Sequence, residues 1–372
     1  MIRNLNSEQK KAILKALEAT IGILATWILF LVGFCVYYIY QINRTPDSGD
    51  IAAETMSSKI EPVKPKMNFW SPPAESTLDG DPEKDQILYG KDIIANTALY
   101  FGPKGKVAAH STNGMNCQNC HLDAGTRIFG NNYSAVSSTY PKYRARSGKS
   151  EDIYKRVNDC FERSLNGKAL DTNSKEMQAI LHYIQWLGKD VQKGKKTEGS
   201  GLKEITMLDR ACDPVKGKAI YLEKCQVCHS KNGGGQVNPA NGTFVYPPLW
   251  GPNSYNVGAG LYRISNFARY VKYNMPLGST HELAQLSDEE AWDIAAFVNS
   301  QEHPKKDLSH DWPKISEKPF DYPFGPFSDG FKEEQHKFGP FKPIIEAKKK
   351  AEKEKQNYCH PAVVENGDKK LI

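Results

Sequence analysis

The sequence has no large excess of charge of either sign. Lysine and arginine together number 49, aspartate and glutamate 43, and the formal net charge is only +6 over 372 residues. No stretch combines basic and aromatic side chains in the manner of a nucleic-acid-binding surface, so no nucleic-acid partner is expected. The hydrophobic content of 39% is ordinary for globular proteins, and the length allows about two domains with extensions.

Long apolar runs are also scarce, and the one that stands out lies near the N-terminus. It extends from Ala19 to Ile42, which is enough to cross a bilayer as a helix. Basic residues before it favour a cytoplasmic N-terminus. A cleaved signal peptide is the alternative, but the run is long and no A-x-A cleavage pattern follows it. We therefore predict that residues 1–42 form a cytoplasmic N-terminus and a single-pass anchor in the inner membrane, with the rest of the chain in the periplasm.

The motif C-x-x-C-H occurs twice. The first copy consists of Cys117, Cys120 and His121, and the second of Cys225, Cys228 and His229. Two thiols at this spacing can reach the vinyl groups of one porphyrin, and the adjacent histidine can bind its iron. A zinc knuckle or a redox dithiol is the alternative, but neither pair has the further ligands that zinc requires. The sequence thus predicts two covalently bound haem c groups.

The segments around the two motifs share one plan. An Asp-Pro pair, Asp81-Pro82 or Asp213-Pro214, opens a helix before each motif, a glycine-rich loop follows it, and a helix with aromatic residues closes the unit. This is the plan of a class I cytochrome c domain. We predict a mainly α fold with two such domains in tandem, residues 80–200 and 201–303, behind an N-terminal transmembrane helix. Further helices are expected over 152–165, 174–187, 260–273 and 287–300.

The segments outside these domains have a different composition. Residues 43–79 are rich in proline, serine, threonine and charge, which predicts a flexible linker. Residues 304–372 contain two F-G-P-F units and a charged helical tail, and they either pack over the domains or dock a partner. An oxidising compartment permits a disulfide between Cys212 and Cys359, a pairing that the sequence does not establish.

The second axial ligand of each haem iron is less clear from the residues. In the second unit Met275, before Pro276, is the first candidate and His281 the weaker one. The first unit has no corresponding Met-Pro pair, and its candidates are Cys160, Met177 and His182. For Cys160 the alternative is a buried free cysteine, which is common in protein cores.

Three stretches, residues 140–168, 246–263 and 273–278, resemble the dihaem c-type thiosulfate dehydrogenase family, whose members also act as tetrathionate synthases or reductases. The resemblance covers about residues 80–300 and includes segments far from the haem motifs. It implies that the first haem is bound by His121 and Cys160, with the active site beside it. Family members use Lys or Met at the second haem. Here Asn274 occupies the place of such a lysine and Lys272 is out of register, so His229 and Met275 are expected.

The implied reaction joins two thiosulfate dianions into tetrathionate and releases two electrons. Two dianions about 4 Å apart repel by about 4 kcal/mol even in water, so the site needs fixed cations. Guanidinium groups suit oxyanions better than lysine does, although haem propionates compete for some of them. We expect Cys160 to be surrounded by substrate contacts from Arg144, Arg146, Arg156, Arg163 and Ser164.

These observations predict a membrane-anchored dihaem cytochrome c that oxidises thiosulfate, or reduces tetrathionate, and passes electrons from a His/Cys haem to a His/Met haem. The redox partner would be a cytochrome c or a terminal oxidase. One alternative is a tethered electron carrier that feeds a terminal oxidase without a substrate of its own. Another is an enzyme for a different sulfur oxyanion, such as sulfite. The arginine-rich segment around Cys160 favours an enzyme, because a carrier does not need it.

Overall fold

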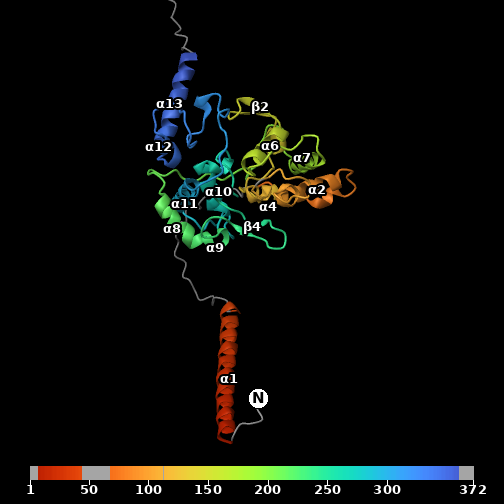
Figure 1. The fold of residues 1–372 in the computed structure, drawn as a ribbon, viewed down its shortest axis with the longest axis vertical. Helices are drawn as coiled ribbons and strands as arrows, with labels where there is room; N and C mark the ends of the chain where they lie inside the picture. The colour runs from red at the N-terminus through yellow and green to blue at the C-terminus, as the bar shows by residue number, and fades with distance from the viewer. Residues whose placement is uncertain (1–6, 44–67, 112, 360–372) are drawn as a thin grey trace, which may run out of the picture. The chain divides into compact units, whose positions relative to one another are not determined.

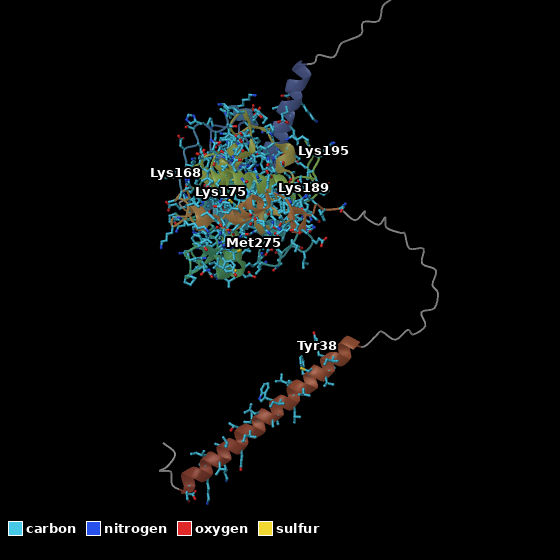
Figure 2. All side chains as sticks on the ribbon, turned by 90° about the vertical axis from the view of Figure 1, so that its right-hand side faces the viewer. Tyr38, Lys168, Lys175, Lys189, Lys195 and Met275 are labelled. Carbon is cyan, nitrogen blue, oxygen red and sulfur yellow. The ribbon has the colours of Figure 1, made fainter. Side chains whose placement is uncertain are left out.

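The structure is a computed structural model that describes residues 7–43, 68–111 and 113–359. The chain divides into two parts, helix α1 (Ser7–Asn43) and a folded body with all the described residues from 68 onward, and each part is described by itself. Within the folded body, the segment around the first C-x-x-C-H motif is called the first unit and the segment around the second motif the second unit. In α1 the span Lys11–Ile39 has a mean hydropathy of 2.3, and no side chain of its apolar part is buried (Figure 2). This helix is therefore long and apolar enough to serve as a membrane anchor or a signal sequence.

The folded body is mainly helical, and the first unit follows the predicted plan. Its helices are α2 (Lys84–Ala95), α3 (Thr97–Phe101), α4 (Leu122–Gly125), α5 (Val136–Thr139), α6 (Ile153–Arg163) and α7 (Lys175–Leu187), with turns η1 (Glu75–Leu78) and η2 (Cys117–Asn119). The predicted helices over 152–165 and 174–187 are thus confirmed as α6 and α7. Each begins at a side-chain cap, since Asp152 accepts from the Lys155 amide at 2.7 Å and Ser174 accepts from the Met177 amide at 3.2 Å.

The second unit repeats this arrangement. Its helices are α8 (Pro214–Lys224), α9 (Gln226–His229), α10 (Ile264–Asn274) and α11 (Asp288–Ser300), with turn η3 (Gly260–Tyr262) before α10. Asp213 caps α8, whose first residue is Pro214, and Ser287 forms a capping box with Glu290 at the start of α11. The Asp-Pro and Ser-x-x-Glu patterns in the sequence account for both helix starts.

In each unit the first and last helices cross at a glycine. Gly90 of α2 lies against the Ala179 carbonyl of α7, and Gly217 of α8 lies against the Asp293 carbonyl of α11. A Cβ at either glycine would overlap the facing carbonyl oxygen, so the helices approach closely only because both positions lack a side chain. The two units therefore share the same helix crossing. Figure 1 shows α2 beside α7 and α8 beside α11.

Two short hairpins lie where the sequence indicated only loops. Strand β1 (Lys142–Arg144) pairs antiparallel with β2 (Lys149–Glu151), with Arg144 opposite Lys149. Strand β3 (Gln236–Val237) pairs with β4 (Phe244–Tyr246) across an irregular register. Neither hairpin has the alternation of apolar and polar residues over several positions that marks a half-buried strand, so no sequence pattern predicts them.

The predicted linker is shorter at its C-terminal end than the sequence indicated. Residues 44–67 lie outside the described part of the chain. After them Trp70 packs against the core of the first unit, and Leu78 within η1 is almost fully buried. Residues 68–79 thus belong to the folded body rather than to the linker.

The extension after residue 303 packs over both units. Its helices are α12 (Glu333–Phe338) and α13 (Lys342–Cys359), and the turn η4 (Ile315–Glu317) precedes them. The F-G-P-F phenylalanines pack inward: Phe324 stacks on Tyr262, Phe327 stacks on His336, and Phe341 lies in the second core. These contacts favour the packing interpretation of the extension.

The disulfide between Cys212 and Cys359 that the sequence permits is not tested by the structure. Cys212 is buried in the second core, but the side chain of Cys359 lies outside those that the structure describes.

The glycine crossing leads to a stability prediction. We expect Gly217→Ala to lower the free energy of unfolding by about 1–3 kcal/mol, because the added methyl group forces α8 away from α11. Gly330→Ala, where no heavy atom lies within 4 Å of the added Cβ, should stay within about 0.5 kcal/mol of the parent. Denaturant unfolding of the haem-loaded protein measures both. Equal losses in the two variants would contradict the packing argument.

Candidate active site

A cavity of about 180 Å³ lies inside the first unit, and its walls fit a haem c group. The side chains of Cys117, Cys120 and His121 line it together with apolar groups such as Ile94 and Ile184. The Nδ1 atom of His121 lies 2.6 Å from the Asn131 carbonyl oxygen, so Nδ1 donates and Nε2 is left to bind iron. Burial lowers the pKa of His121 to about 4, which keeps the imidazole neutral, as a metal ligand must be.

Cys160 lines the same cavity as His121. The other two candidates for the sixth ligand of the first haem lie elsewhere. Met177 is fully buried in the core formed by α7, and the Nδ1 atom of His182 lies 3.5 Å from the Glu83 carboxylate. Among the candidates named from the sequence, only Cys160 shares the cavity with the motif.

The second unit contains a cavity of about 310 Å³ that also fits a haem c group. Cys225, Cys228, His229 and Met275 line it, and the Nδ1 atom of His229 lies 2.8 Å from the Pro247 carbonyl oxygen. His281, the weaker candidate, instead packs between the rings of Phe69 and Phe129. Lys272 is held by Asp288 at 2.6 Å, so its ammonium group is not directed at this cavity.

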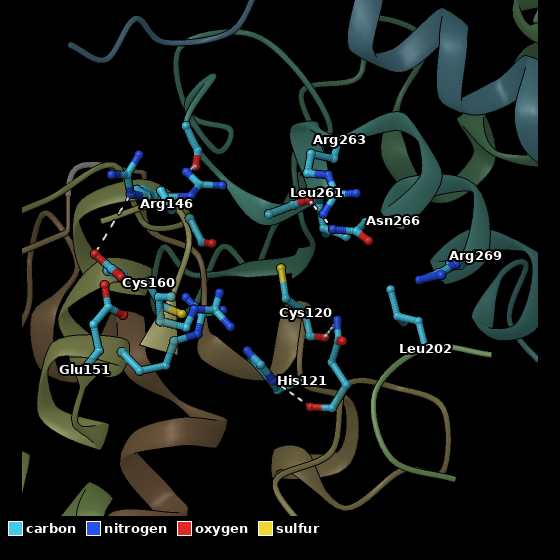
Figure 3. Close-up of a pocket in the computed structure, with 18 of the residues that line it drawn as sticks. Cys120, His121, Arg146, Glu151, Cys160, Leu202, Leu261, Arg263, Asn266 and Arg269 are labelled. Carbon is cyan, nitrogen blue, oxygen red and sulfur yellow. Dashed lines mark hydrogen bonds and ion pairs between the residues drawn. The ribbon is translucent and has the colours of Figure 1, made fainter. Parts of the chain in front are cut away.

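A third cavity, of about 300 Å³, adjoins the first and is rich in arginine; we call it the arginine pocket. Cys120, His121 and Cys160 line it as well, so the two cavities adjoin. Six arginines are among its lining residues: Arg144, Arg146, Arg156, Arg163, Arg263 and Arg269. Two carboxylates, Glu151 and Asp159, line it too. The pocket is therefore positively charged beside the predicted position of the first haem (Figure 3).

Helix α6 and the β1–β2 hairpin position the predicted site residues. Helical spacing puts Arg156, Cys160 and Arg163 on the face of α6 that lines the pocket, as predicted. Ser164 caps the helix, and its amide donates to the Cys160 carbonyl. Arg144 ends β1, and Arg146 follows in the turn of the hairpin.

The second unit fixes the end of α6 and closes the pocket. The backbone amide of Asn256 donates to the Arg163 carbonyl at 3.1 Å, and its side-chain amide donates to the Glu162 carbonyl at 2.9 Å. From the same unit come Gly258, Gly260, Leu261, Arg263, Asn266 and Arg269 of the pocket wall. The arginine pocket therefore exists only where the two units meet.

Four of the six arginines are bound to carboxylates. Asp311 accepts two bonds from Arg163, at 2.8 and 3.0 Å, and one from Arg146 at 3.3 Å. Asp321 accepts from Arg263 at 2.6 and 2.8 Å. Arg269 pairs with Glu204, which is largely exposed, so this pair is weak.

The remaining two arginines are available to an anion. Within the described part of the chain no carboxylate forms an ion pair with Arg144 or Arg156. Attraction to the Cys160 sulfur, against the effect of burial, raises the pKa of Arg156 above its ordinary value. Burial and the neighbouring Arg163 lower the pKa of Arg146 to about 10, so Arg146 is still charged at neutral pH.

Comparison with known proteins identifies the family of this chain. The family model described as SoxA/TsdA, cytochrome c domain matches residues 107–192, and the cytochrome c model matches residues 214–302. A thiosulfate dehydrogenase of Psychrobacter arcticus is 36% identical over 73% of this chain and 79% of its own length. The chain belongs to the SoxA/TsdA cytochrome c family of thiosulfate dehydrogenase homologues. Its fold is therefore mainly helical with two cytochrome c domains, which imply haem c binding.

Other relatives agree with this assignment. The thiosulfate dehydrogenase of Allochromatium vinosum is 40% identical over 62% of this chain and 83% of its own length. The solved thiosulfate dehydrogenase TsdBA of Marichromatium purpuratum, in its "as isolated" form, superposes with a TM-score of 0.59 at 30% identity. That match covers 67% of this chain and 51% of the other.

The structure brings together all six residues that the sequence predicted for the substrate site, Cys160, Ser164 and four arginines. It also adds residues that the sequence reasoning missed. Arg263 and Arg269 belong to the second unit, and Asp311 and Trp312 to the extension. Arg263 ends a stretch that resembles the family, so a signal for it was present. Nothing local in the sequence indicates that Asp311 or Trp312 reaches the pocket.

The second cavity gives a spectroscopic prediction. Leucine matches methionine in volume but has no lone pair for iron, so Met275→Leu should keep both covalent haems and lower the midpoint potential of one of them. Met177→Leu, on the buried face of α7, is the matched control and should change neither potential. A potentiometric titration followed by absorbance reports both. An unchanged pair of potentials in Met275→Leu would mean that another group binds the second iron.

Proposed function

We propose that the protein oxidises two thiosulfate dianions to one tetrathionate dianion in the arginine pocket, with the reverse reaction using the same contacts. One observation carries the proposal. A pocket in which two arginines form no ion pair with a described carboxylate adjoins the cavity of the first C-x-x-C-H motif, and Cys160 lines both. An electron carrier without a substrate has no use for such a pocket. The thiosulfate dehydrogenase relatives support the choice of substrate.

The chain's own residues have to bring two dianions together. Arg144 and Arg156 bind the oxyanion groups, and planar guanidinium groups do so with paired hydrogen bonds. Arg156 also holds the first thiosulfate beside the Cys160 sulfur, the group with which it interacts most strongly. The Ser164 hydroxyl, one turn further along α6, donates to a sulfonate oxygen. Arg146 and Arg163 add positive charge from positions fixed by Asp311.

For the haem groups we propose that His121 and Cys160 would hold the first iron, and that His229 and Met275 would hold the second. The shared cavities and the Nδ1 contacts of both histidines support this assignment. When bound, the two haems would supply one-electron redox chemistry between the substrate and a redox partner such as a cytochrome c or a terminal oxidase. The two cavities share Met115, Asn116 and Cys120 in their walls, so they adjoin.

The placement in the cell is part of the proposal. We take residues 1–42 as an uncleaved inner-membrane anchor, because the apolar span of α1 is long and follows basic residues. The cytochrome c domains, proposed as residues 80–200 and 201–303, are then periplasmic, the compartment in which haem c is attached.

An optical titration tests the proposed reaction. Thiosulfate should reduce the haems of the purified, detergent-solubilised protein and yield half a mole of tetrathionate per mole consumed. Cys160→Met should retain both covalent haems, because the four attachment cysteines are intact, yet lose turnover by at least about a hundredfold, as expected for loss of a group at the reacting centre.

The other outcomes of this titration separate the alternatives. Oxidation of the dithionite-reduced protein by tetrathionate, without reduction by thiosulfate, would identify an enzyme that works in the reverse direction. Reduction by sulfite alone would indicate another sulfur oxyanion. No response to any of these anions would favour the tethered electron carrier, and near-normal rates in Cys160→Met would refute the role of that sulfur.

The free arginines give a second kinetic prediction. Arg144→Gln and Arg156→Gln should each raise KM for thiosulfate by about tenfold or more, because each removes a charge-assisted contact worth about 1.5–3 kcal/mol. Arg269→Gln loses a guanidinium already paired with Glu204 and should have a smaller effect. Steady-state rates with an artificial electron acceptor provide the comparison. Equal effects of all three changes would show that carboxylate pairing does not distinguish these arginines.

A further inference from the structure

The extension forms part of the arginine pocket. Trp312 lines it, and the Trp312 amide donates to the Arg146 carbonyl at 2.7 Å. The Arg146 guanidinium also lies over the Trp312 ring, 5.4 Å from its centre. The extension is therefore built into the wall of the site and does more than cover the outside of the two units.

Asp311 is the buried carboxylate through which the extension binds Arg146 and Arg163. Its side chain is only 8% exposed and accepts hydrogen bonds from Arg163 through both oxygens, at 2.8 and 3.0 Å. Arg146 reaches the same carboxylate at 3.3 Å and donates to the Gly258 carbonyl at 2.6 Å. A two-oxygen contact fixes the plane of a guanidinium group as well as its position. Asp311 therefore occupies donors on two arginines that would otherwise face the pocket.

A second aspartate of the extension repeats this arrangement on the opposite wall. Asp321 is fully buried and accepts from Arg263 at 2.6 and 2.8 Å. Its other oxygen accepts from the amide and hydroxyl of Ser265, at 3.1 and 2.5 Å. Half of the pocket's arginines are thus held by carboxylates that come from the extension.

We propose that Asp311 is a specificity-determining residue that sets how tightly the pocket holds sulfur oxyanions. This inference rests on the proposed function of the arginine pocket. With Asp311 in place, Arg146 and Arg163 contribute positive charge to the pocket but have few N–H groups left to donate to a substrate. Arg144 and Arg156 then make the direct contacts. Without it, four arginines bind the dianion, and substrate and product are both held more tightly. Binding both states more tightly lowers KM without raising kcat, and slow release of tetrathionate then lowers kcat.

The test compares Asp311→Asn with Asp329→Asn in the full-length, haem-loaded protein. Asp329 lies in the same extension and pairs with His336 at 3.0 Å, but it does not line the pocket. Asp311→Asn should lower KM for thiosulfate and the inhibition constant of sulfate by about fivefold each, lower kcat, and steepen the dependence of KM on ionic strength. Asp329→Asn should leave all four quantities within about twofold of the parent.

Two further variants keep the test decisive if Asp311→Asn fails to fold. Asp311→Glu keeps the charge and should leave sulfate inhibition close to that of the parent. Asp321→Asn frees Arg263 and should also strengthen sulfate inhibition. A higher KM with unchanged sulfate inhibition and an unchanged salt dependence in Asp311→Asn or Asp321→Asn would overturn the proposal, since it would show that these aspartates only hold the extension in place.

Failure of this proposal can be told apart from failure of the proposed reaction. If the parent protein does not oxidise thiosulfate, sulfate and thiosulfate binding are measured directly by calorimetry on the parent and on Asp311→Asn. Tighter binding of either anion by Asp311→Asn would still support the role of Asp311. Equal affinities, or no binding by either protein, would overturn it.

Discussion

The structure depends on how a group of guanidinium ions is kept partly buried at the junction of two domains. Charges of one sign cannot be taken out of water together without partners, since each loses its hydration and repels the others. The chain meets this requirement with three carboxylates from two segments: Asp311 and Asp321 from the extension, and Glu204 from the connection between the units. The two arginines left without such partners, Arg144 and Arg156, define where an anion supplies the missing charge.

Much of this could be predicted from the sequence because the relevant signals are local. The C-x-x-C-H motifs, the Asp-Pro and Ser-x-x-Glu helix starts and the helical spacing of Arg156, Cys160 and Arg163 all lie within a few residues. Each depends on short-range geometry that any α-helix imposes. The sequence alone therefore predicts α6 and the residues on its pocket-facing side.

The features that could not be predicted depend on contacts between distant segments. The β1–β2 hairpin has no strand pattern, and it is held in part by Trp312, whose amide bonds to Arg146. Asp311 lies 148 positions after its main partner Arg163, and no local pattern records that pairing. The contacts of Arg146 could not be predicted for the same reason. Arg146 looked like a direct substrate contact in the sequence, but its guanidinium is engaged by Asp311 and the Gly258 carbonyl.

The contact of Asn256 with the end of α6 has a consequence for how this protein can vary. Cytochrome c domains each enclose their own core, and in principle one such module can be exchanged for another. Here the second unit contributes the wall from Gly258 to Arg269 and holds the carbonyls of Glu162 and Arg163. Replacing it with an unrelated cytochrome would remove one wall of the anion pocket, with Arg263 and Arg269, along with one predicted haem site. We therefore expect the two units to vary together as one module, because exchanging the second unit would also disrupt the pocket beside the first haem site.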